Sequence, residues 1–155
     1  MSLWGTPLLR FAYGITQNQA DAEDAVQETF LRLWQKHRRS SATQITRAYA
    51  YQTVLNVCRT QYRKNRRRHE LSRQDIDGSP GLDIATKLDV YHAVMASSPV
   101  DREIILLHYF ADLSIEETAQ VLGIGIATAK TRLFRARQRL AQQLPNYEPA
   151  TGGSQ

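Results

Sequence analysis

The sequence contains a single cysteine, Cys58, among its 155 residues. One thiol can form neither an intrachain disulfide nor a cysteine cluster for zinc, which fits a reducing cytoplasm. The four histidines show no metal-ligand spacing: His37, His69, His92 and His108. Neither a glycine-rich phosphate loop nor a serine, histidine and aspartate set is present. The sequence therefore offers no catalytic site and indicates no cofactor.

Long apolar runs are also missing from the sequence. Nowhere do about 18 apolar residues follow one another, the length that favours a membrane-spanning helix. Residues 1–7 lack the basic start and the apolar stretch of a secretory signal. We therefore expect a cytoplasmic protein that is neither secreted nor inserted in a membrane. Segments with the alternating pattern of a β-strand are absent as well, which favours an all-helical fold.

Charge is abundant and unevenly placed along the chain. The formal net charge is +5 and the sequence pI is near 9.6, which favours a polyanionic partner. Residues 32–73 hold twelve basic residues and one acid, residues 74–124 hold nine acids and two basic residues, and residues 125–144 hold five basic residues and no acid. This alternation predicts two separate cationic surfaces, as in a protein that contacts nucleic acid twice.

A first helical domain is predicted over residues 1–69. After a short apolar segment at residues 8–15, apolar residues recur at steps of three and four over residues 21–37, with acids at the start and bases near the end. Residues 47 to about 67 have one apolar side and a strongly basic final third, which predicts a longer helix. Residues 70–81 are polar and contain glycine and proline, so we expect a flexible linker there.

A second helical domain is predicted over residues 82–144, with a disordered tail at residues 145–155. Its helical spacing covers residues 82–95 and 100–110. A capping box and a glycine turn then precede a basic helix from about Ala127 to Gln143, a pattern typical of a helix-turn-helix. The expected fold class is all-α: two small helical domains joined by a flexible linker, the second a helix-turn-helix (winged-helix-like) DNA-binding domain.

The start of the final helix is a candidate for reading duplex DNA. In helix-turn-helix proteins this end of the second helix enters the major groove, where side chains contact base edges and nearby phosphates. The side chains placed for this role are Ala127, Thr128, Lys130, Thr131, Phe134 and Arg135. The alternative is a solvated basic helix on an ordinary bundle, and the agreement of capping box, glycine turn and helix length argues against it.

The basic block from Arg59 to Arg68 is a candidate for binding a single strand. Tyr49, Tyr51 and Tyr62 lie on or beside the same predicted helix, where tyrosines can stack on unpaired bases while arginines hold phosphates. A merely solvated helix end is the alternative. Asn56 either reads a base edge or is a satisfied buried amide, and the sequence leaves both interpretations open.

The acidic residues at the start of the 21–37 helix have a structural explanation, since carboxylates stabilise helix N-termini. Paired carboxylates could also indicate glycosidase or metal chemistry. That interpretation lacks a partner cluster elsewhere in the sequence.

Both halves of the sequence resemble one family, the RNA polymerase sigma factors of the extracytoplasmic-function (ECF) subgroup. Residues 8–16 and 20–34 resemble family regions 2.1 and 2.2, residues 49–68 resemble regions 2.3 and 2.4, and residues 100–124 and 128–140 resemble region 4. The most specific motif is Asp-Ala-Glu-Asp-Ala-Val-Gln-Glu-Thr-Phe, which begins at Asp21. The resemblance implies a non-enzymatic factor that binds core RNA polymerase and directs initiation at promoters.

The resemblance also implies roles for individual residues. The clamp of the largest catalytic subunit of polymerase would be contacted by Asp24, Gln27, Glu28, Arg32 and Trp34. The minus-ten element would be captured as a single strand by Tyr49, Asn56, Arg59, Tyr62, Arg63 and Lys64. The minus-thirty-five duplex would be read by Thr128, Lys130, Thr131, Phe134 and Arg135. An anti-sigma factor is an expected further partner.

The sequence departs from the family pattern at three places. The first helix is expected to be short, because family members usually carry a further turn before Leu8. Tyr49 stands where a tryptophan is usual, and the turn before the final helix contains Ile126, an unusual residue for an exposed position. Two other functions stay as alternatives. One is a helix-turn-helix regulator that acts without polymerase, and the other is an enzyme acting on nucleic acid, which the missing carboxylate or histidine cluster disfavours.

Overall fold

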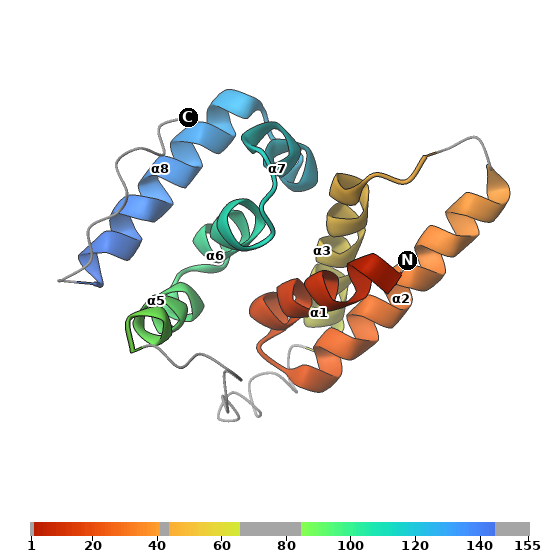
Figure 1. The fold of residues 1–155 in the computed structure, drawn as a ribbon, viewed down its shortest axis with the longest axis horizontal. Helices are drawn as coiled ribbons and strands as arrows, with labels where there is room; N and C mark the ends of the chain where they lie inside the picture. Colours follow the sequence, from red (N-terminus) through yellow and green to blue (C-terminus); the bar gives the residue numbers. More distant parts are fainter. Residues whose placement is uncertain (1, 41–43, 66–84, 145–155) are drawn as a thin grey trace.

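The computed structural model describes residues 2–40, 44–65 and 85–144, and every regular element in them is a helix. The first domain consists of α1 (Ser2–Thr16), α2 (Gln19–Arg39) and α3 (Arg47–Lys64). The second consists of α5 (Ala85–Ala96), α6 (Pro99–Ile105), the π-helix η1 (Leu106–Phe110), α7 (Ile115–Leu122) and α8 (Ile126–Gln142) (Figure 1). The predicted all-α class is confirmed. The predicted linker at 70–81 and tail at 145–155 lie outside the described residues.

The first helix is longer than its apolar segment indicated. α1 begins at Ser2, so well over one turn precedes Leu8, and the expectation of a short first helix is wrong. Trp4, in this added part, lies one turn before Leu8 on the same side of the helix and packs against the core. The apolar pattern missed this start because Gly5, Thr6 and Pro7 interrupt it.

Side-chain caps fix where the helices of both domains begin. The Asn18 side chain accepts a hydrogen bond from the Asp21 backbone N–H at the start of α2, and the Thr46 hydroxyl accepts one from Tyr49 N–H at the start of α3. Ser98 does the same at the start of α6, where Pro99 supplies the first helical residue. Each cap satisfies a backbone donor that has no partner within the helix.

The core of the first domain lies where its three helices meet. The buried residues of this core include Leu8 and Phe11 of α1, Ala22, Ala25, Val26 and Leu33 of α2, and Tyr51, Val54 and Leu55 of α3. The Phe11 and Tyr51 rings pack edge to face, with centroids 5.3 Å apart. Each of the three helices contacts the other two.

The second domain departs from the prediction at residues 100–110, which are not one regular helix. α6 ends at Ile105 and the chain continues as the wider turn η1, in which the Ala111 N–H donates to the Leu106 carbonyl, five residues back, at 2.8 Å. Leu106 and Leu107 in this turn are buried, while Phe110 at its end is 56% exposed. The apolar pattern predicted a helix here, but apolar spacing alone does not distinguish an α-helix from a π-helix.

The predicted helix-turn-helix is present and has the predicted signals. Ser114 and Glu117 form a capping box, each side chain accepting a hydrogen bond from the other residue's backbone N–H at 3.0 Å. Gly123 ends α7 with φ +71°, a left-handed conformation that glycine adopts without steric cost. The described part of this domain contains no strand, so the motif is built from helices alone.

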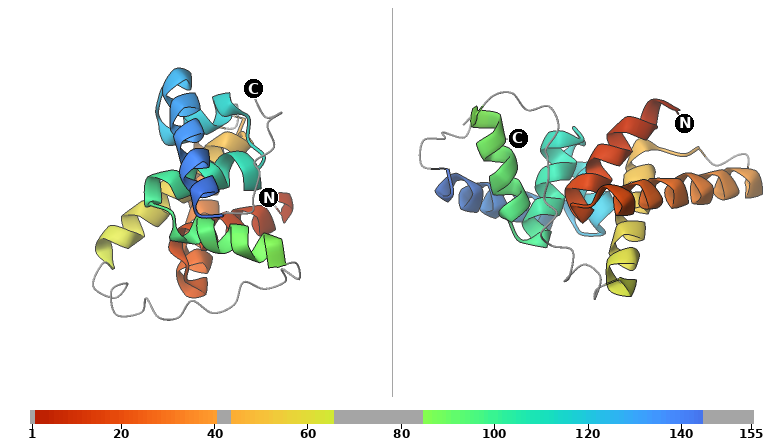
Figure 2. Two further views of the ribbon diagram at one scale, coloured as in Figure 1. Left: turned by 90° about the vertical axis from the view of Figure 1, so that its left-hand side faces the viewer. Right: turned by 90° about the horizontal axis from the view of Figure 1, so that it is seen from below.

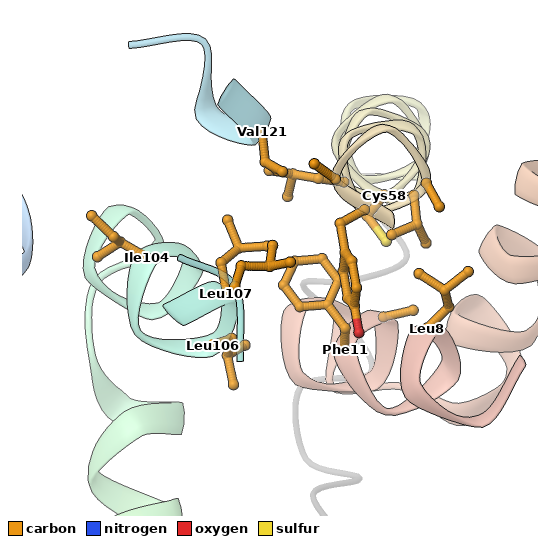
Figure 3. Close-up of a cluster of buried hydrophobic side chains, with 14 of the residues drawn as sticks. Leu8, Phe11, Cys58, Ile104, Leu106, Leu107 and Val121 are labelled. Carbon is orange, nitrogen blue, oxygen red and sulfur yellow. The ribbon is translucent and has the colours of Figure 1, made fainter. Parts of the chain in front are cut away.

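The two domains lie against each other. α3 of the first domain contacts α7 of the second, and α1 contacts α6 and η1 (Figures 1 and 2). Figure 3 shows Leu8, Phe11 and Cys58 on one side of this junction and Ile104, Leu106, Leu107 and Val121 on the other. The buried side chains of both domains therefore form one continuous hydrophobic cluster.

Candidate nucleic-acid interface

The start of α8 presents the predicted recognition residues to solvent. Thr128, Lys130, Thr131, Phe134 and Arg135 are all exposed. The other side of the helix packs on the domain through Ala129, Leu133 and Ala136, which are buried. The sequence-predicted residues are therefore brought together on one open face.

Two apolar side chains stand out on that face. Phe134 is 58% exposed, and Ile126, the first residue of the helix, is 45% exposed. These two exposed apolar side chains lie on a cationic helix and are candidates for contact with a partner. The sequence had identified Phe134 as a contact and Ile126 only as a departure from the family pattern.

The basic end of α3 forms a second open surface. Asn56 is exposed, whereas its neighbours Leu55 and Val57 are buried, so the interpretation of Asn56 as a buried amide is wrong. Arg63 follows Asn56 by seven residues, which places both on the same side of the helix. Tyr62 is 53% exposed beside them, and Lys64 is exposed as well.

The tyrosines of α3 do not share one environment. Tyr51 lies in the core against Phe11 and is 2% exposed, so its proposed stacking on bases is wrong. Burial raises the pKa of the Tyr51 hydroxyl, with a smaller opposing effect from Arg47. Tyr49 is half-buried, and the Lys36 ammonium lies 4.7 Å from its ring centre. This cation–π contact brings Lys36, which the sequence did not indicate, into the candidate site.

Arg59 has a partner that the sequence did not indicate. Its Nη2 donates to Glu103 Oε1 at 2.6 Å and its Nε donates to Glu103 Oε2 at 3.2 Å. Glu103 belongs to α6, so this bidentate ion pair joins the two domains. Arg59, one of the residues predicted to capture the minus-ten strand, therefore forms an ion pair with the other domain.

The outer face of α2 forms a third open surface. Asp24 and Gln27 are exposed, and Glu28 pairs with Arg32 at 2.9 Å one turn on. Trp34 is 50% exposed and lies under the Arg38 guanidinium, 4.9 Å from it. Leu31, also 50% exposed, lies on the same side of the helix and is not among the residues predicted from the sequence. Helical spacing could have found it, because Leu31 follows Asp24 by two turns and Gln27 by one.

Other kinds of site find no support in the described part of the chain. No group of three or more histidine, cysteine, aspartate or glutamate residues suited to a metal ion occurs there. No helix among the described residues is long and apolar enough to cross a membrane.

Two family models match separate parts of the chain. The family model for Sigma-70 region 2 matches residues 3–68, and the model for Sigma-70 region 4 matches residues 98–140. The ECF RNA polymerase sigma factor EcfG of Rhodopseudomonas palustris is 32% identical over 152 residues, which cover 92% of this chain and 82% of the relative. The chain belongs to the ECF RNA polymerase sigma factors. Another relative of this sigma factor, the RNA polymerase sigma-E factor of Streptomyces coelicolor, is 28% identical over 88% of this chain and 79% of its own length.

Solved structures extend the likeness to the arrangement of both domains. The sigma factor RpoE of Bartonella quintana, in complex with the anti-sigma factor NepR, superposes with a TM-score of 0.73 at 28% identity, over 94% of each chain. CnrH, in complex with the cytosolic domain of CnrY, superposes with a TM-score of 0.67 at 26% identity, over 95% of this chain and 86% of CnrH. Members of this family are non-catalytic initiation factors that direct RNA polymerase to promoters, and this sigma factor has both of their DNA-binding regions.

Proposed function

We propose that this sigma factor binds core RNA polymerase through the outer face of α2, captures the minus-ten element with α3, and reads the minus-thirty-five duplex with α8. The supporting observation is that each helix packs one side into the core and leaves open the side that holds the predicted contacts. The residue assignments come from the family pattern. Most of these residues are exposed, whereas Glu28 and Tyr49 are half-buried and Arg59 pairs with Glu103.

The α2 face suits a protein partner. Its charged residues surround Leu31 and Trp34, two apolar side chains that are each half exposed. An apolar centre with a polar rim is the usual composition of a protein interface. We therefore add Leu31 to the proposed contacts with the polymerase clamp: Asp24, Gln27, Glu28, Arg32 and Trp34.

The end of α3 suits a single strand. Bases that leave the duplex need a stacking surface and a polar group that reads an edge, while the backbone needs cations. Tyr49 and Tyr62 supply rings, Asn56 supplies an amide, and Arg63 and Lys64 supply charge. We keep Arg59 in this proposed set on the family pattern, although its guanidinium pairs with Glu103 in the structure.

The face of α8 suits the major groove of a duplex. Arg135 and Lys130 can donate to guanine or hold phosphates, whereas the methyl groups of Thr128 and Thr131 and the Phe134 ring can contact thymine methyls. This proposed role depends on the helix-turn-helix geometry, which leaves the N-terminal half of the second helix open.

We also propose an anti-sigma factor as a further partner, because the superposing sigma factor RpoE of Bartonella quintana was solved in complex with the anti-sigma factor NepR. The proposed location is the cytoplasm, where RNA polymerase acts. We propose no enzymatic activity and no cofactor for this sigma factor.

Transcription in vitro with purified core polymerase tests the function as a whole. The sigma factor should convert core enzyme into a form that initiates at specific sites on a panel of promoters. A regulator that works without polymerase would bind duplex DNA but would neither bind core enzyme nor support initiation. That result would replace the proposed function with this alternative.

A further inference from the structure

The Lys36 ammonium lies 4.7 Å from the centre of the Tyr49 ring. The two residues come from different helices of the first domain, Lys36 from the last turn of α2 and Tyr49 from the first turn of α3. A cation is attracted to the electron-rich face of an aromatic ring, so the contact favours one orientation of that ring. The end of α2 therefore acts directly on a side chain that is proposed to capture DNA.

The position of Lys36 at a helix C-terminus explains its charge but not its contact. The other residues of this turn, His37, Arg38 and Arg39, are basic as well. Positive charge there offsets the helix dipole and needs no particular partner. Those three residues are exposed, whereas Lys36 is half-buried and lies over a ring of another helix. Because ordering a lysine side chain costs conformational entropy, this contact goes beyond what the helix end requires.

The backbone of Tyr49 is fixed by two threonines. Its N–H donates to the Thr46 hydroxyl at 3.1 Å, and its carbonyl accepts from the Thr53 hydroxyl at 2.9 Å. These hydrogen bonds hold the residue at the start of α3 but do not set the orientation of its ring. The ring is half-buried and packs partly against the core. Lys36 supplies a further constraint, and this one acts on the ring itself.

Tyr49 lies on the side of α3 that is proposed to capture the single strand. Asn56 follows Tyr49 by seven residues, so the two share one side of the helix and are about 10 Å apart along its axis. That distance matches about three stacked nucleotides at about 3.4 Å each. A strand that places one base at Asn56 can therefore place another on Tyr49. Stacking is favourable only when the ring meets the base at a suitable angle, so the orientation of the ring affects capture.

We propose that Lys36 is a positioning residue for strand capture: its ammonium holds the Tyr49 ring in the orientation in which an unpaired base stacks on it. Lys36 thus acts through the ring and not as a phosphate contact of its own. The inference deepens the proposed function and rests on it, because the base that stacks on Tyr49 belongs to the captured minus-ten strand.

Binding of a labelled single-stranded oligothymidine to the full chain tests this role. Stacking of bases on aromatic rings depends little on sequence, so the probe requires no known promoter. Lys36→Met removes the ammonium but keeps an unbranched side chain, and it should weaken binding about two- to fivefold, the range expected for one cation–π contact. Lys36→Arg keeps a cation over the ring and should restore most of the affinity. Gln35→Met, at the exposed neighbouring position, should match the wild type.

A double-mutant cycle separates positioning of the ring from direct attraction of the strand. In a Tyr49→Leu background, which lacks the ring, Lys36→Met should cause little further loss. Lys64→Met is the matched comparison, because Lys64 is an exposed lysine proposed to hold a phosphate and should cause the same loss in both backgrounds. Helical circular dichroism should be unchanged in all variants. Equal losses from Lys36→Met with and without the ring would make Lys36 a phosphate contact and overturn the proposal. A lower melting temperature with unchanged affinity would limit the contact to stability and overturn it as well.

A fluorescent adenine analogue in the minus-ten strand supplies the measurement in the holoenzyme. On a template with a pre-melted bubble, stacking on the Tyr49 ring should quench the analogue at one position of the strand. Lys36→Met should reduce this quenching, and Lys36→Arg should restore it. Equal quenching in the wild type and Lys36→Met would contradict the role of Lys36. If the oligothymidine cycle shows the coupling but no variant initiates with core polymerase, the proposed function fails and the positioning of Tyr49 by Lys36 stands. If the wild type initiates but the cycle is additive, the inference alone fails.

Discussion

Asp101 on α6 and Arg139 near the end of α8 form a bidentate ion pair inside the second domain. Arg139 Nε donates to one carboxylate oxygen at 2.7 Å and Nη2 donates to the other at 3.1 Å. The Asp101 side chain is 6% exposed, so the arginine is the partner that keeps a buried charge satisfied. Its hydrogen bond to Asp101 and the aspartate charge raise the pKa of Arg139.

Arg139→Ala should therefore lower the melting temperature of the second domain, because it leaves the Asp101 carboxylate buried without its partner. Scanning calorimetry of the full chain would measure the shift, with Gln138→Ala as an exposed control on the same helix. An unchanged melting temperature together with weaker binding to all DNA sequences would instead make Arg139 a phosphate contact.

Asp24→Lys combined with Glu28→Lys should weaken binding to core polymerase by about tenfold or more, because reversed charges across an interface repel. Stability should change little, since the exposed Glu28–Arg32 pair is of the kind worth roughly 0.3 to 0.5 kcal/mol. Competition for core enzyme against an unmodified sigma factor is the measurement. Asp89→Lys combined with Glu116→Lys, at exposed positions of the other domain, is the charge-matched control. Equal competition by the Asp24 and Glu28 double variant would reject the α2 face.

Leu31→Ala tests the residue that the structure adds to this surface. The side chain is half exposed, so its removal should cost little stability but should lower core affinity if Leu31 lies at the centre of the interface. The same competition assay applies. Full affinity in Leu31→Ala would confine the interface to the polar residues around it.

Asn56→Ala should slow open-complex formation about tenfold, a loss that corresponds to about 1 to 3 kcal/mol for one base-edge contact. The comparison uses a duplex promoter and a template with a pre-melted bubble. A fall on both templates indicates that Asn56 reads an unpaired base, and a fall on the duplex alone indicates a role in melting. Unchanged rates on both would leave this exposed amide without a function in initiation.

Arg135→Ala should narrow the affinity gap between the cognate upstream element and scrambled DNA. A bidentate contact from arginine to guanine is worth about 1 to 3 kcal/mol of discrimination, whereas a phosphate contact weakens all sequences alike and lowers the salt slope by about one. Titrations of both duplexes across a salt series would separate these cases. Equal losses on both duplexes would assign Arg135 to the phosphate backbone.

Cys58 should be unreactive in the folded chain. Burial, with smaller effects from Asp21 and Glu103, raises the pKa of its thiol to about 12 from an ordinary value of 9.0. The folded chain therefore holds the thiol proton more tightly than the unfolded chain does. The contribution of this difference to the free energy of unfolding is complete below about pH 9 and is lost as the pH rises toward 12. Alkylation at pH 8 should proceed only after unfolding, and rapid labelling of native protein would contradict the buried position.

Local features of this sigma factor were determined by the sequence alone. The Ser114–Glu117 capping box and the Gly123 turn act within a few residues, so their chemistry is readable without knowledge of the fold. The division of each helix into a buried and an open side also follows from spacing, as the open face of α8 demonstrates. The Asp-Ala-Glu-Asp-Ala-Val-Gln-Glu-Thr-Phe motif of α2, together with the helical spacing, was enough to predict the family and its function.

Only the tertiary structure decided which part of each helix is buried by neighbouring helices. Tyr51 and Tyr62 are eleven residues apart and therefore lie on the same side of α3, yet Tyr51 is 2% exposed and Tyr62 is 53% exposed. Tyr51 lies against Phe11 of α1, whereas Tyr62 lies near the basic end of α3. Periodicity gives the direction of a side chain but not the extent of the neighbouring helix. For the same reason the Arg59–Glu103 contact, between residues 44 positions apart, depends on packing that no local pattern specifies.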